Sequence, residues 1–327
     1  MTLFLSRTHV EKLLTPEVCI DAVEDAFRQL AQGKVPPPGI LGLHGGDGSF
    51  HVKAGLLTAD RPYFAAKINA NFPHNGPRYG LPTIQGAVIL FDSANGQPLA
   101  IMDSMAITAL RTAAASAVAA KHLAAEECDV ALICGCGAQA LPQLHALMRV
   151  RRPRRVYAYD QDPKKAAAFA VSASRELEVD VMPAPDLAPA VAASTIVVTC
   201  TTARRYFIAR DMVRPGTFIA AVGADHDEKQ EIDPRLLADA TVVTDLTEQA
   251  AAIGDLHHAI VAGTMVREAV HAELGEIVAG RKRGRANAQE IIVFDSTGTG
   301  LQDVAAAIAT YRRAVDQRQG AGFHLAA

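Results

Sequence analysis

The sequence lacks an excess of charge of either sign. Its 327 residues carry 32 Lys and Arg against 35 Asp and Glu, which gives a formal net charge of −3. Such a balance gives no reason to expect a polyanion as a binding partner. We therefore expect neither nucleic acid nor a membrane among the partners of this chain.

A hydrophobic leader and a cysteine framework are lacking too. Met1–Leu5 is short and charged residues follow from Arg7, which fits neither a signal peptide nor a membrane span. The five cysteines are an odd number. Cys134 and Cys136 flank a glycine turn, without the His or Cys cluster that a zinc site needs. We expect reduced thiols, a cytoplasmic protein and no metal site.

The most informative segment that is present runs from Leu132 to Ala140. An apolar strand leads into a Gly-x-Gly-x-x-Ala turn, a helix follows, and a second strand ends on Asp160. This order is the dinucleotide-binding fingerprint. Gly135 permits the tight turn, Gly137 lets the backbone approach the pyrophosphate, and Ala140 keeps the helix close to the sheet. The pattern predicts a nucleotide-binding domain and favours redox chemistry.

Asp160 indicates which nucleotide is bound. A carboxylate at this strand end accepts hydrogen bonds from the ribose hydroxyls and repels a 2′-phosphate, so NAD(H) is favoured over NADP(H). At another strand end, Thr199–Thr201 is a candidate contact to the nicotinamide ribose. Cys200 within it has no implied His partner, so we do not expect a nucleophile there.

Strand and helix patterns alternate over the second half of the chain. The apolar runs are rich in Val, Ile and Ala without polar alternation, which is typical of a parallel sheet buried on both faces. They are residues 130–134, 156–160, 195–199, 217–223, 241–245 and 291–295.

The first third of the chain has a different pattern. We expect an amphipathic helix over 16–30, then strands over 50–56, 63–69 and 86–91 in a small antiparallel sheet. An Ala-rich helix over 108–125 precedes the nucleotide-binding part. A last helix over 302–313 is expected to pack back on the first domain, since the nucleotide domain is complete before it.

Several segments together resemble the ornithine cyclodeaminase/μ-crystallin family, and the likeness covers nearly the whole chain. They are Ala66–Asn69, Asn71–Pro73, Leu110–Ala114, the Gly135–Ala140 turn, Ala221–Asp225 and Phe294–Gly298.

The resemblance implies an α/β fold in which a Rossmann domain is inserted into a smaller α+β domain that binds substrate and forms a homodimer. We place the smaller domain at 1–120 plus 301–327, and the NAD-binding domain at 121–300. Members of the family act at the α-carbon of amino acids through a bound nicotinamide cofactor.

The resemblance also implies roles for three charged residues. Lys67 would hold the substrate carboxylate and donate a proton, Arg111 would hold the same carboxylate or the cofactor edge, and Asp225 would exchange protons with the substrate nitrogen. Each has a structural alternative: a lysine that reaches solvent from an edge strand, an arginine–carboxylate pair, or an aspartate that caps a turn or helix.

The remaining candidate cofactor residues come from the turn, the helix before it and the strand ends. The set is Thr112, Gly135, Cys136, Gly137, Ala138, Gln139, Asp160, Thr199, Cys200, Thr201, Val222, Gly223, Ser296, Thr297 and Gly298.

The sequence departs from the family at the substrate end. Gly39 stands where members carry an arginine for the carboxylate, and His51-Val52-Lys53 replaces the segment whose acidic residue holds the distal amine of ornithine. Lys53 is a candidate substitute for the missing arginine. With His51, Lys53 and Arg78 added to Lys67 and Arg111, an acidic or doubly anionic substrate is favoured.

We therefore expect an NAD(H)-dependent oxidoreductase that reduces an imino acid or cyclic imine, or an oxo acid with ammonia, to an L-amino acid. One alternative is an ornithine-type cyclodeaminase, which forms L-proline and ammonia with recycled NAD. The other is a μ-crystallin-like binding protein without turnover.

Overall fold

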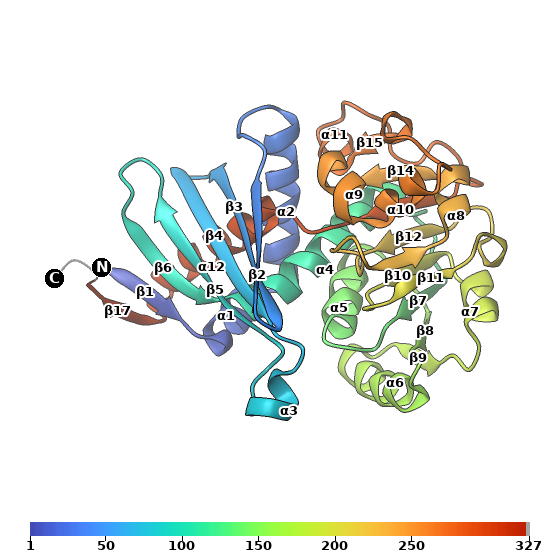
Figure 1. Cartoon of the computed structure of the whole chain (residues 1–327), viewed down its shortest axis with the longest axis horizontal. Helices are drawn as coiled ribbons and strands as arrows, with labels where there is room; N and C mark the ends of the chain where they lie inside the picture. The colour runs from blue at the N-terminus through green and yellow to red at the C-terminus, as the bar shows by residue number, and fades with distance from the viewer. Residues whose placement is uncertain (325–327) are drawn as a thin grey trace. The chain divides into compact units, whose positions relative to one another are not determined.

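A parallel sheet of eight strands forms the centre of the larger part of the chain (Figure 1). Its order is β15(Ala272–Glu273), β14(Thr241–Thr244), β16(Ile292–Asp295), β12(Phe218–Ala221), β10(Ile196–Thr199), β7(Val130–Cys134), β8(Arg155–Tyr159), β9(Asp180–Pro183). β7 is the first of these in the chain, yet it lies between β10 and β8. The strand order therefore reverses at β7, the place where doubly wound sheets bind ligands.

The helices of this part follow their strands in turn. They are α5(Ala140–Val150), α6(Pro163–Leu177), α7(Leu187–Ala193), α8(Pro234–Asp239), α9(Thr247–Ile253), α10(Asp255–Val261) and α11(Leu274–Val278). A separate parallel pair is formed by β11(Arg204–Ile208) and β13(Gln230–Ile232). Short 3₁₀ turns lie at Arg210–Met212 and Arg267–Ala269. All six expected strands are present. Strands β9 and β15 were not expected, because both are short edge strands with few apolar residues.

A second, mixed sheet forms the other part. Its order is β17(Ala321–Phe323), β1(Thr2–Leu5), β6(Pro98–Asp103), β5(Ile84–Asp92), β4(Pro62–Asn71), β3(Gly48–Thr58), β2(Gly39–Gly45). The three expected strands are present as β3, β4 and β5 and pair antiparallel. The sheet is larger than expected, with seven strands, and it is mixed, because β1 pairs with β6 in parallel. Of the extra strands, β1 and β17 are short and β2 is rich in Gly, which hides them in the sequence.

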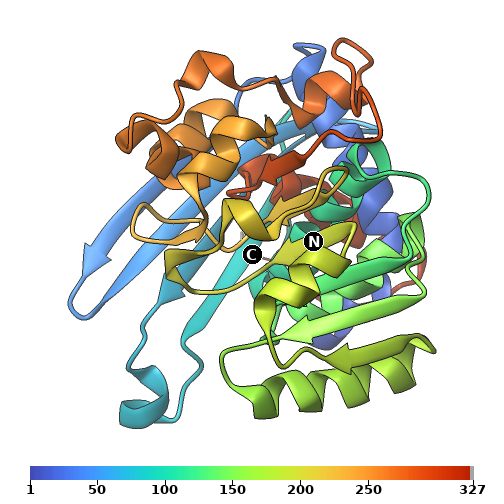
Figure 2. The same cartoon turned by 90° about the vertical axis from the view of Figure 1, so that its right-hand side faces the viewer.

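Helices cover one face of the mixed sheet. α12(Gly300–Asp316) contacts β3, β4, β5 and α2(Pro16–Ala31), and α1(Arg7–Leu13) contacts β6. Glycine makes the approach of α12 possible, because a Cβ on Gly300 would lie 2.5 Å from the Ala54 carbonyl oxygen. The short α3(Asn75–Tyr79) stands apart from the sheet, between β4 and β5 (Figure 2).

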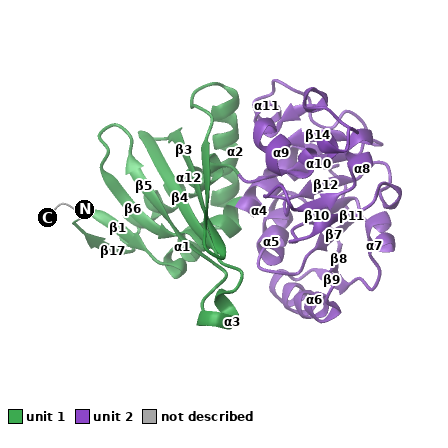
Figure 3. Ribbon diagram, viewed as in Figure 1, with its two compact units in different colours: residues 1–111, 299–327 green, residues 112–298 purple. Residues whose placement is uncertain are grey.

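The computed structural model describes residues 1–324, and the chain divides into two compact units (Figure 3). Unit 1 comprises Met1–Arg111 and the chain from Thr299 onward, and unit 2 comprises Thr112–Gly298. The division falls inside α4(Ser104–Leu123), earlier than the boundary of 120 expected from the sequence. Among residues 1–324, no helix is long and apolar enough to cross a membrane.

Candidate functional site

The glycine turn of unit 2 has the geometry that a phosphate cradle needs. Gly135 adopts a φ of 95°, and a Cβ there would lie 2.9 Å from the carbonyl oxygen of Cys200. Gly137 faces open space, since a Cβ on it would meet no atom within 4 Å. A side chain at either position would strain the turn or fill the cradle, so the residues present fit a dinucleotide.

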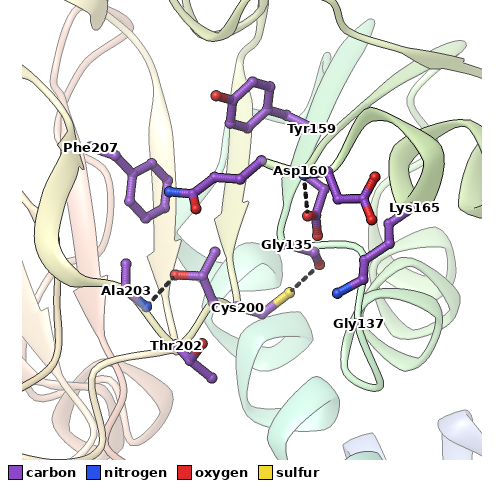
Figure 4. Close-up of a pocket in the computed structure, with 12 residues that line it drawn as sticks. Gly135, Gly137, Tyr159, Asp160, Lys165, Cys200, Thr202, Ala203 and Phe207 are labelled. Atoms are coloured by element: carbon purple, nitrogen blue, oxygen red, sulfur yellow. Dashed lines mark hydrogen bonds between the residues drawn. The ribbon is translucent and has the colours of Figure 1, made fainter.

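A cavity of about 540 Å³ opens beside this turn (Figure 4). Gly135, Gly137, Asp160, Cys200 and Thr201, all expected from the sequence, contribute to its lining. Asp160 accepts hydrogen bonds from the backbone N–H groups of Cys136 at 2.9 Å and of Asp162 at 2.9 Å. Its carboxylate therefore fixes the turn as well as facing the cavity.

Cys200 also lines this cavity, and its thiol is not expected to react. Its Sγ donates to the carbonyl oxygen of Gly135 at 3.2 Å, a bond drawn in Figure 4. Burial raises the pKa of Cys200 well above its usual range, and the nearby Glu231 charge adds to the effect. A thiol with a raised pKa stays protonated, in agreement with the expectation that Cys200 is not a nucleophile.

Glu231 ties together the ends of two strands in the same sheet. Its carboxylate accepts from Thr199 Oγ1 at 2.6 Å, from the Thr201 N–H at 2.7 Å and from the Gly223 N–H at 2.8 Å. Thr199 and Gly223 follow from β10 and β12, which are neighbours. Glu231 thus fixes three of the candidate cofactor residues, although the sequence did not single it out for this role.

Asp245 fixes the loop after β16 in a similar way, by accepting hydrogen bonds from it. It accepts from Ser296 Oγ at 3.3 Å, Thr297 Oγ1 at 3.0 Å and the Gly298 N–H at 2.7 Å. Buried polar groups need such partners, because an unpaired one loses its hydration. The three candidate nicotinamide-pocket residues are therefore held in a defined conformation by a single carboxylate.

The other candidate cofactor residues lie in α4, in the turn before α5 and after β12. Ala138 and Gln139 lead into α5, and Val222 follows β12 and donates its N–H to the Thr199 carbonyl oxygen at 2.9 Å. Thr112 is buried in α4, and its carbonyl oxygen accepts from Ser116.

Unit 1 contains a buried cluster of charges around one carboxylate. Asp303 on α12 accepts from Lys67 Nζ on β4 at 2.9 Å and from Arg111 Nε on α4 at 3.0 Å. Arg111 also donates to Gln302 Oε1 at 2.8 Å. The relative exposures of Lys67, Arg111 and Asp303 are 4%, 5% and 1%, so desolvation makes each charge costly unless it is paired.

Lys53 joins this cluster as a third cation. It lies directly opposite Lys67 in the pairing of β3 with β4, so both side chains point to the same face of the sheet. Burial, followed by the positive charges of Arg111 and Lys53, lowers the pKa of Lys67 from 10.5 to about 7, against the opposing charge of Asp303. The cluster thus brings two lysines and an arginine to the carboxylate of Asp303.

The same cations act on Asp303. Burial alone would raise its pKa, but the charges of Arg111, Lys67 and Lys53 hold the pKa of Asp303 below the usual 3.8. Asp303 is therefore the anion of the cluster. A lone acidic residue between the apolar Leu301 and Val304 in the expected last helix was the signal that sequence reasoning missed.

Three expected site residues lie outside the Lys67–Arg111–Asp303 cluster. His51 is on the inner face of β3, where its Nε2 lies 2.8 Å from Ser49 Oγ. Arg78 is exposed on α3 and pairs with Asp47. Asp225 belongs to unit 2, is half-exposed and pairs with Lys229. The expected convergence of Arg78 on the buried lysines is not seen.

Comparisons with known proteins agree with both units. The model of the ornithine cyclodeaminase/mu-crystallin family matches residues 1–318. An archaeal alanine dehydrogenase, solved as a dimer with bound NAD, is 38% identical with a TM-score of 0.94, and 99% of each chain is covered.

Two further similar structures are those of reductases. The Thermococcus litoralis Δ¹-pyrroline-2-carboxylate reductase, in complex with NADH and L-proline, is 34% identical with a TM-score of 0.92, covering 98% of this chain and 100% of that one. The Paracoccus denitrificans iminosuccinate reductase, in complex with NAD⁺, is 32% identical with a TM-score of 0.91, covering 98% of this chain and 99% of that one.

Proposed function

This chain belongs to the ornithine cyclodeaminase/mu-crystallin family and is an NAD-dependent oxidoreductase acting on C–N bonds, and on that premise we propose that its substrate is an imino acid with two carboxylates. In the forward direction the imine takes up a hydride and a proton and becomes an L-amino acid. Iminosuccinate, which would give aspartate, is a compound of this class.

The observation that carries the proposal is the set of three buried cations, Lys53, Lys67 and Arg111, around the single carboxylate of Asp303. Two lysines and an arginine carry more hydrogen-bond donors than the carboxylate of Asp303 can accept, so this cluster suits a substrate with two carboxylates.

Each cation has a distinct task in this proposal. The planar fork of Arg111 suits the carboxylate next to the reacting carbon, since it can donate two parallel hydrogen bonds. Lys67, with its pKa lowered to about 7, is able both to bind that carboxylate and to supply a proton. Lys53, which lies opposite Lys67 on the neighbouring strand, binds the second carboxylate.

The cofactor proposed for unit 2 is NADH, which supplies the hydride when bound. The open face of Gly137 and the N–H groups at the start of α5 would hold the pyrophosphate, and Asp160 would accept from the adenosine ribose. Thr199–Thr201 and Ser296–Gly298, fixed by Glu231 and Asp245, would position the nicotinamide end.

Asp225 is the proposed acid–base group for the substrate nitrogen. It follows β12 at the carboxyl edge of the parallel sheet and carries a lysine partner, Lys229. An ionised carboxylate beside an ammonium can accept a proton from an amine and return it to an imine.

A homodimer is the proposed assembly. The outer face of the mixed sheet, opposite α12, carries large apolar side chains that are exposed: Leu41 at 52%, Leu43 at 55%, Phe50 at 41% and Ile68 at 41%. An apolar face of this kind marks an interaction surface. The archaeal alanine dehydrogenase, whose chain matches this one over 99% of its length, is a dimer.

The test follows NADH absorbance with three acceptors: oxaloacetate with ammonia as a source of iminosuccinate, pyruvate with ammonia, and pyrroline-2-carboxylate. We expect stoichiometric NADH loss, with the highest kcat/KM for the first. Lys53→Met is expected to lower kcat/KM for iminosuccinate at least tenfold more than for pyrroline-2-carboxylate. Lys34→Met, a change of an exposed lysine in the same unit, is the matched control and is expected to change neither.

Two outcomes would argue against the proposal. If Lys53→Met lowered kcat/KM equally for all three acceptors, Lys53 would support the fold and not the second carboxylate. Ammonia release from ornithine without net change in NADH, together with no turnover of the three acceptors, would favour the cyclodeaminase instead.

A further inference from the structure

The first turn of α12, in unit 1 (Figure 3), carries a capping motif that the structure leaves unmade. Thr299 stands at the helix cap and Gln302 three residues later, a pattern in which each side chain normally bonds the backbone N–H of the other residue. Thr299 has the extended backbone of a cap residue, yet its side chain makes no capping hydrogen bond. The two side chains of the motif therefore serve another contact.

Gln302 is turned toward the charged cluster of unit 1. Its Oε1 accepts from Arg111 Nη1 at 2.8 Å, while Arg111 Nε donates to Asp303 at 3.0 Å. A guanidinium only donates hydrogen bonds, so the amide atom that faces Arg111 must be the oxygen. The orientation of the Gln302 amide is thus fixed, and its NH₂ group points away from the atom that holds it.

Two donors of this turn have no partner. Gln302 Nε2 and Thr299 Oγ1 are buried and make no hydrogen bond within residues 1–324, and each of the two residues is only 1% exposed. Because they are three residues apart, they lie on one side of the helix. A buried donor without an acceptor has lost its hydration and gained nothing in return. Both atoms therefore point to a ligand that carries an acceptor group.

The surroundings favour an anion as that ligand. α12 has 17 residues, and the N–H groups of its first turn lack partners within the helix, which makes this end partially positive. Lys67 and Arg111 each carry more N–H donors than the one that they give to Asp303. A carboxylate has two oxygens that accept several hydrogen bonds at once, so it can use the cations and the helix start together.

We propose that Gln302 Nε2 and Thr299 Oγ1 donate to the substrate carboxylate next to the reacting carbon, and that Arg111 binds the same carboxylate. Gln302 is then a specificity-determining residue, which holds Arg111 through its oxygen and the substrate through its NH₂ group. The inference rests on the role of Arg111 in the proposed function. It does not depend on a second carboxylate, because every amino or imino acid carries the first.

Arg111 and Thr299 also stand where the chain passes between the two units. Arg111 is the last residue of unit 1 before the chain enters unit 2, and Thr299 is the first residue of unit 1 after the chain returns. A carboxylate that binds both residues joins these two connections. We therefore expect a bound carboxylate to slow hydrogen exchange of the backbone amides of residues 299–303 in the wild type.

The main experiment compares the wild type with Gln302→Glu. Glutamate keeps an oxygen for Arg111, so the variant is expected to fold, but a carboxylate oxygen replaces the NH₂ group and repels an anion. We expect the Kd of acetate, measured by thermal stabilisation without cofactor against chloride of equal ionic strength, to rise by about tenfold or more. KM for pyrroline-2-carboxylate should rise by a similar factor, with a smaller change in kcat.

Acetamide and one further variant serve as controls. Acetamide has the shape of acetate without its charge, and we expect it to stabilise the wild type less than acetate at the same concentration. Gln97→Glu adds the same charge at an exposed glutamine between β5 and β6 of unit 1. This variant is expected to keep the wild-type Kd of acetate and the wild-type KM.

Thr299 provides an independent pair of variants. Thr299→Ser keeps the hydroxyl group, whereas Thr299→Val keeps the shape of the side chain without it. We expect Thr299→Val to raise the Kd of acetate by about threefold to tenfold, and Thr299→Ser to stay close to the wild type. A side chain that only supported the fold would not show this rescue by serine.

Three results would overturn the inference. The first is a folded Gln302→Glu that binds acetate as tightly as the wild type. The second is a wild type that acetate stabilises no more than acetamide does. The third, which decides the matter if Gln302→Glu does not fold, is an equal Kd of acetate for Thr299→Val and Thr299→Ser.

The same data separate this inference from the proposed function. If acetate binding depends on Gln302 but no acceptor is reduced, the carboxylate subsite stands and the proposed function fails. If imines are reduced and Gln302→Glu leaves both KM and the Kd of acetate unchanged, the proposed function stands and the subsite fails.

Discussion

At the scale of single residues, the charge of Lys67 sets the pH range of the proposed reaction. Because burial and neighbouring cations lower its pKa to about 7, the free enzyme loses the positive charge of Lys67 as pH rises through 7. An uncharged lysine binds a carboxylate poorly and has no proton to give.

We predict that kcat/KM of the wild type for its imino acid falls by about tenfold per pH unit above about pH 7. Lys67→Arg keeps a permanent positive charge, so its profile should lack this fall although its rate is lower. The measurement is kcat/KM from pH 6 to 9 with NADH saturating. A wild-type profile that stayed level across pH 7 would show that Lys67 does not titrate there.

Asp303 provides a second residue-scale prediction. Asp303→Asn removes the only carboxylate shown to bind both Lys67 and Arg111, and leaves those cations to repel each other. We expect a loss of stability of about 3–5 kcal/mol by urea unfolding. A substrate-like dicarboxylate such as succinate should recover part of it, more than acetate at the same concentration. Equal recovery by both anions would argue against a second carboxylate subsite.

At the scale of elements, the approach of α12 to β3 depends on a residue without a side chain. Gly300 opens α12, and a Cβ there would lie within 3 Å of three backbone atoms of Ala54. Backbone cannot yield as a flexible side chain does, so the helix itself must shift. Since α12 carries Asp303, this contact also sets the position of the buried charges.

Gly300→Ala is accordingly predicted to destabilise unit 1 by about 1–3 kcal/mol and to lower kcat/KM more than kcat, because the substrate pocket is distorted. Gly263→Ala is not a suitable control, since Gly263 has a positive φ of 70°. Gly76→Ala is suitable, because a Cβ there meets no atom within 4 Å. Equal effects of the two changes would show that the approach of α12 is not the cause.

At the scale of the whole molecule, the exposed apolar face of the mixed sheet determines assembly in our proposal. Phe50 and Ile68 lie on neighbouring strands of this face and are each 41% exposed. A charge placed there would be desolvated in a dimer but solvated in a monomer.

We predict that Phe50→Glu with Ile68→Glu converts a dimer into a monomer in sedimentation velocity, while far-UV circular dichroism stays unchanged. Val171→Glu, a change of an exposed apolar residue on α6 in unit 2, is the control and should remain dimeric. A wild type that sediments as a monomer at micromolar concentration would refute the proposed assembly.

The sequence by itself determined the nucleotide-binding half. The Gly135–Ala140 turn and the strands around it are local patterns: glycine is required where φ is positive, and apolar runs form strands buried on both faces. Lys67 and Arg111 were singled out by the resemblance to the family, and their apolar neighbours in the sequence agreed with buried charges.

Only the tertiary structure decided what those charges meet. Asp303 lies 236 residues after Lys67. Such pairings depend on how elements pack, and no local pattern encodes them. The mixed sheet was underestimated for the same reason, since short strands such as β1 and β17 form only because a distant partner supplies their hydrogen bonds.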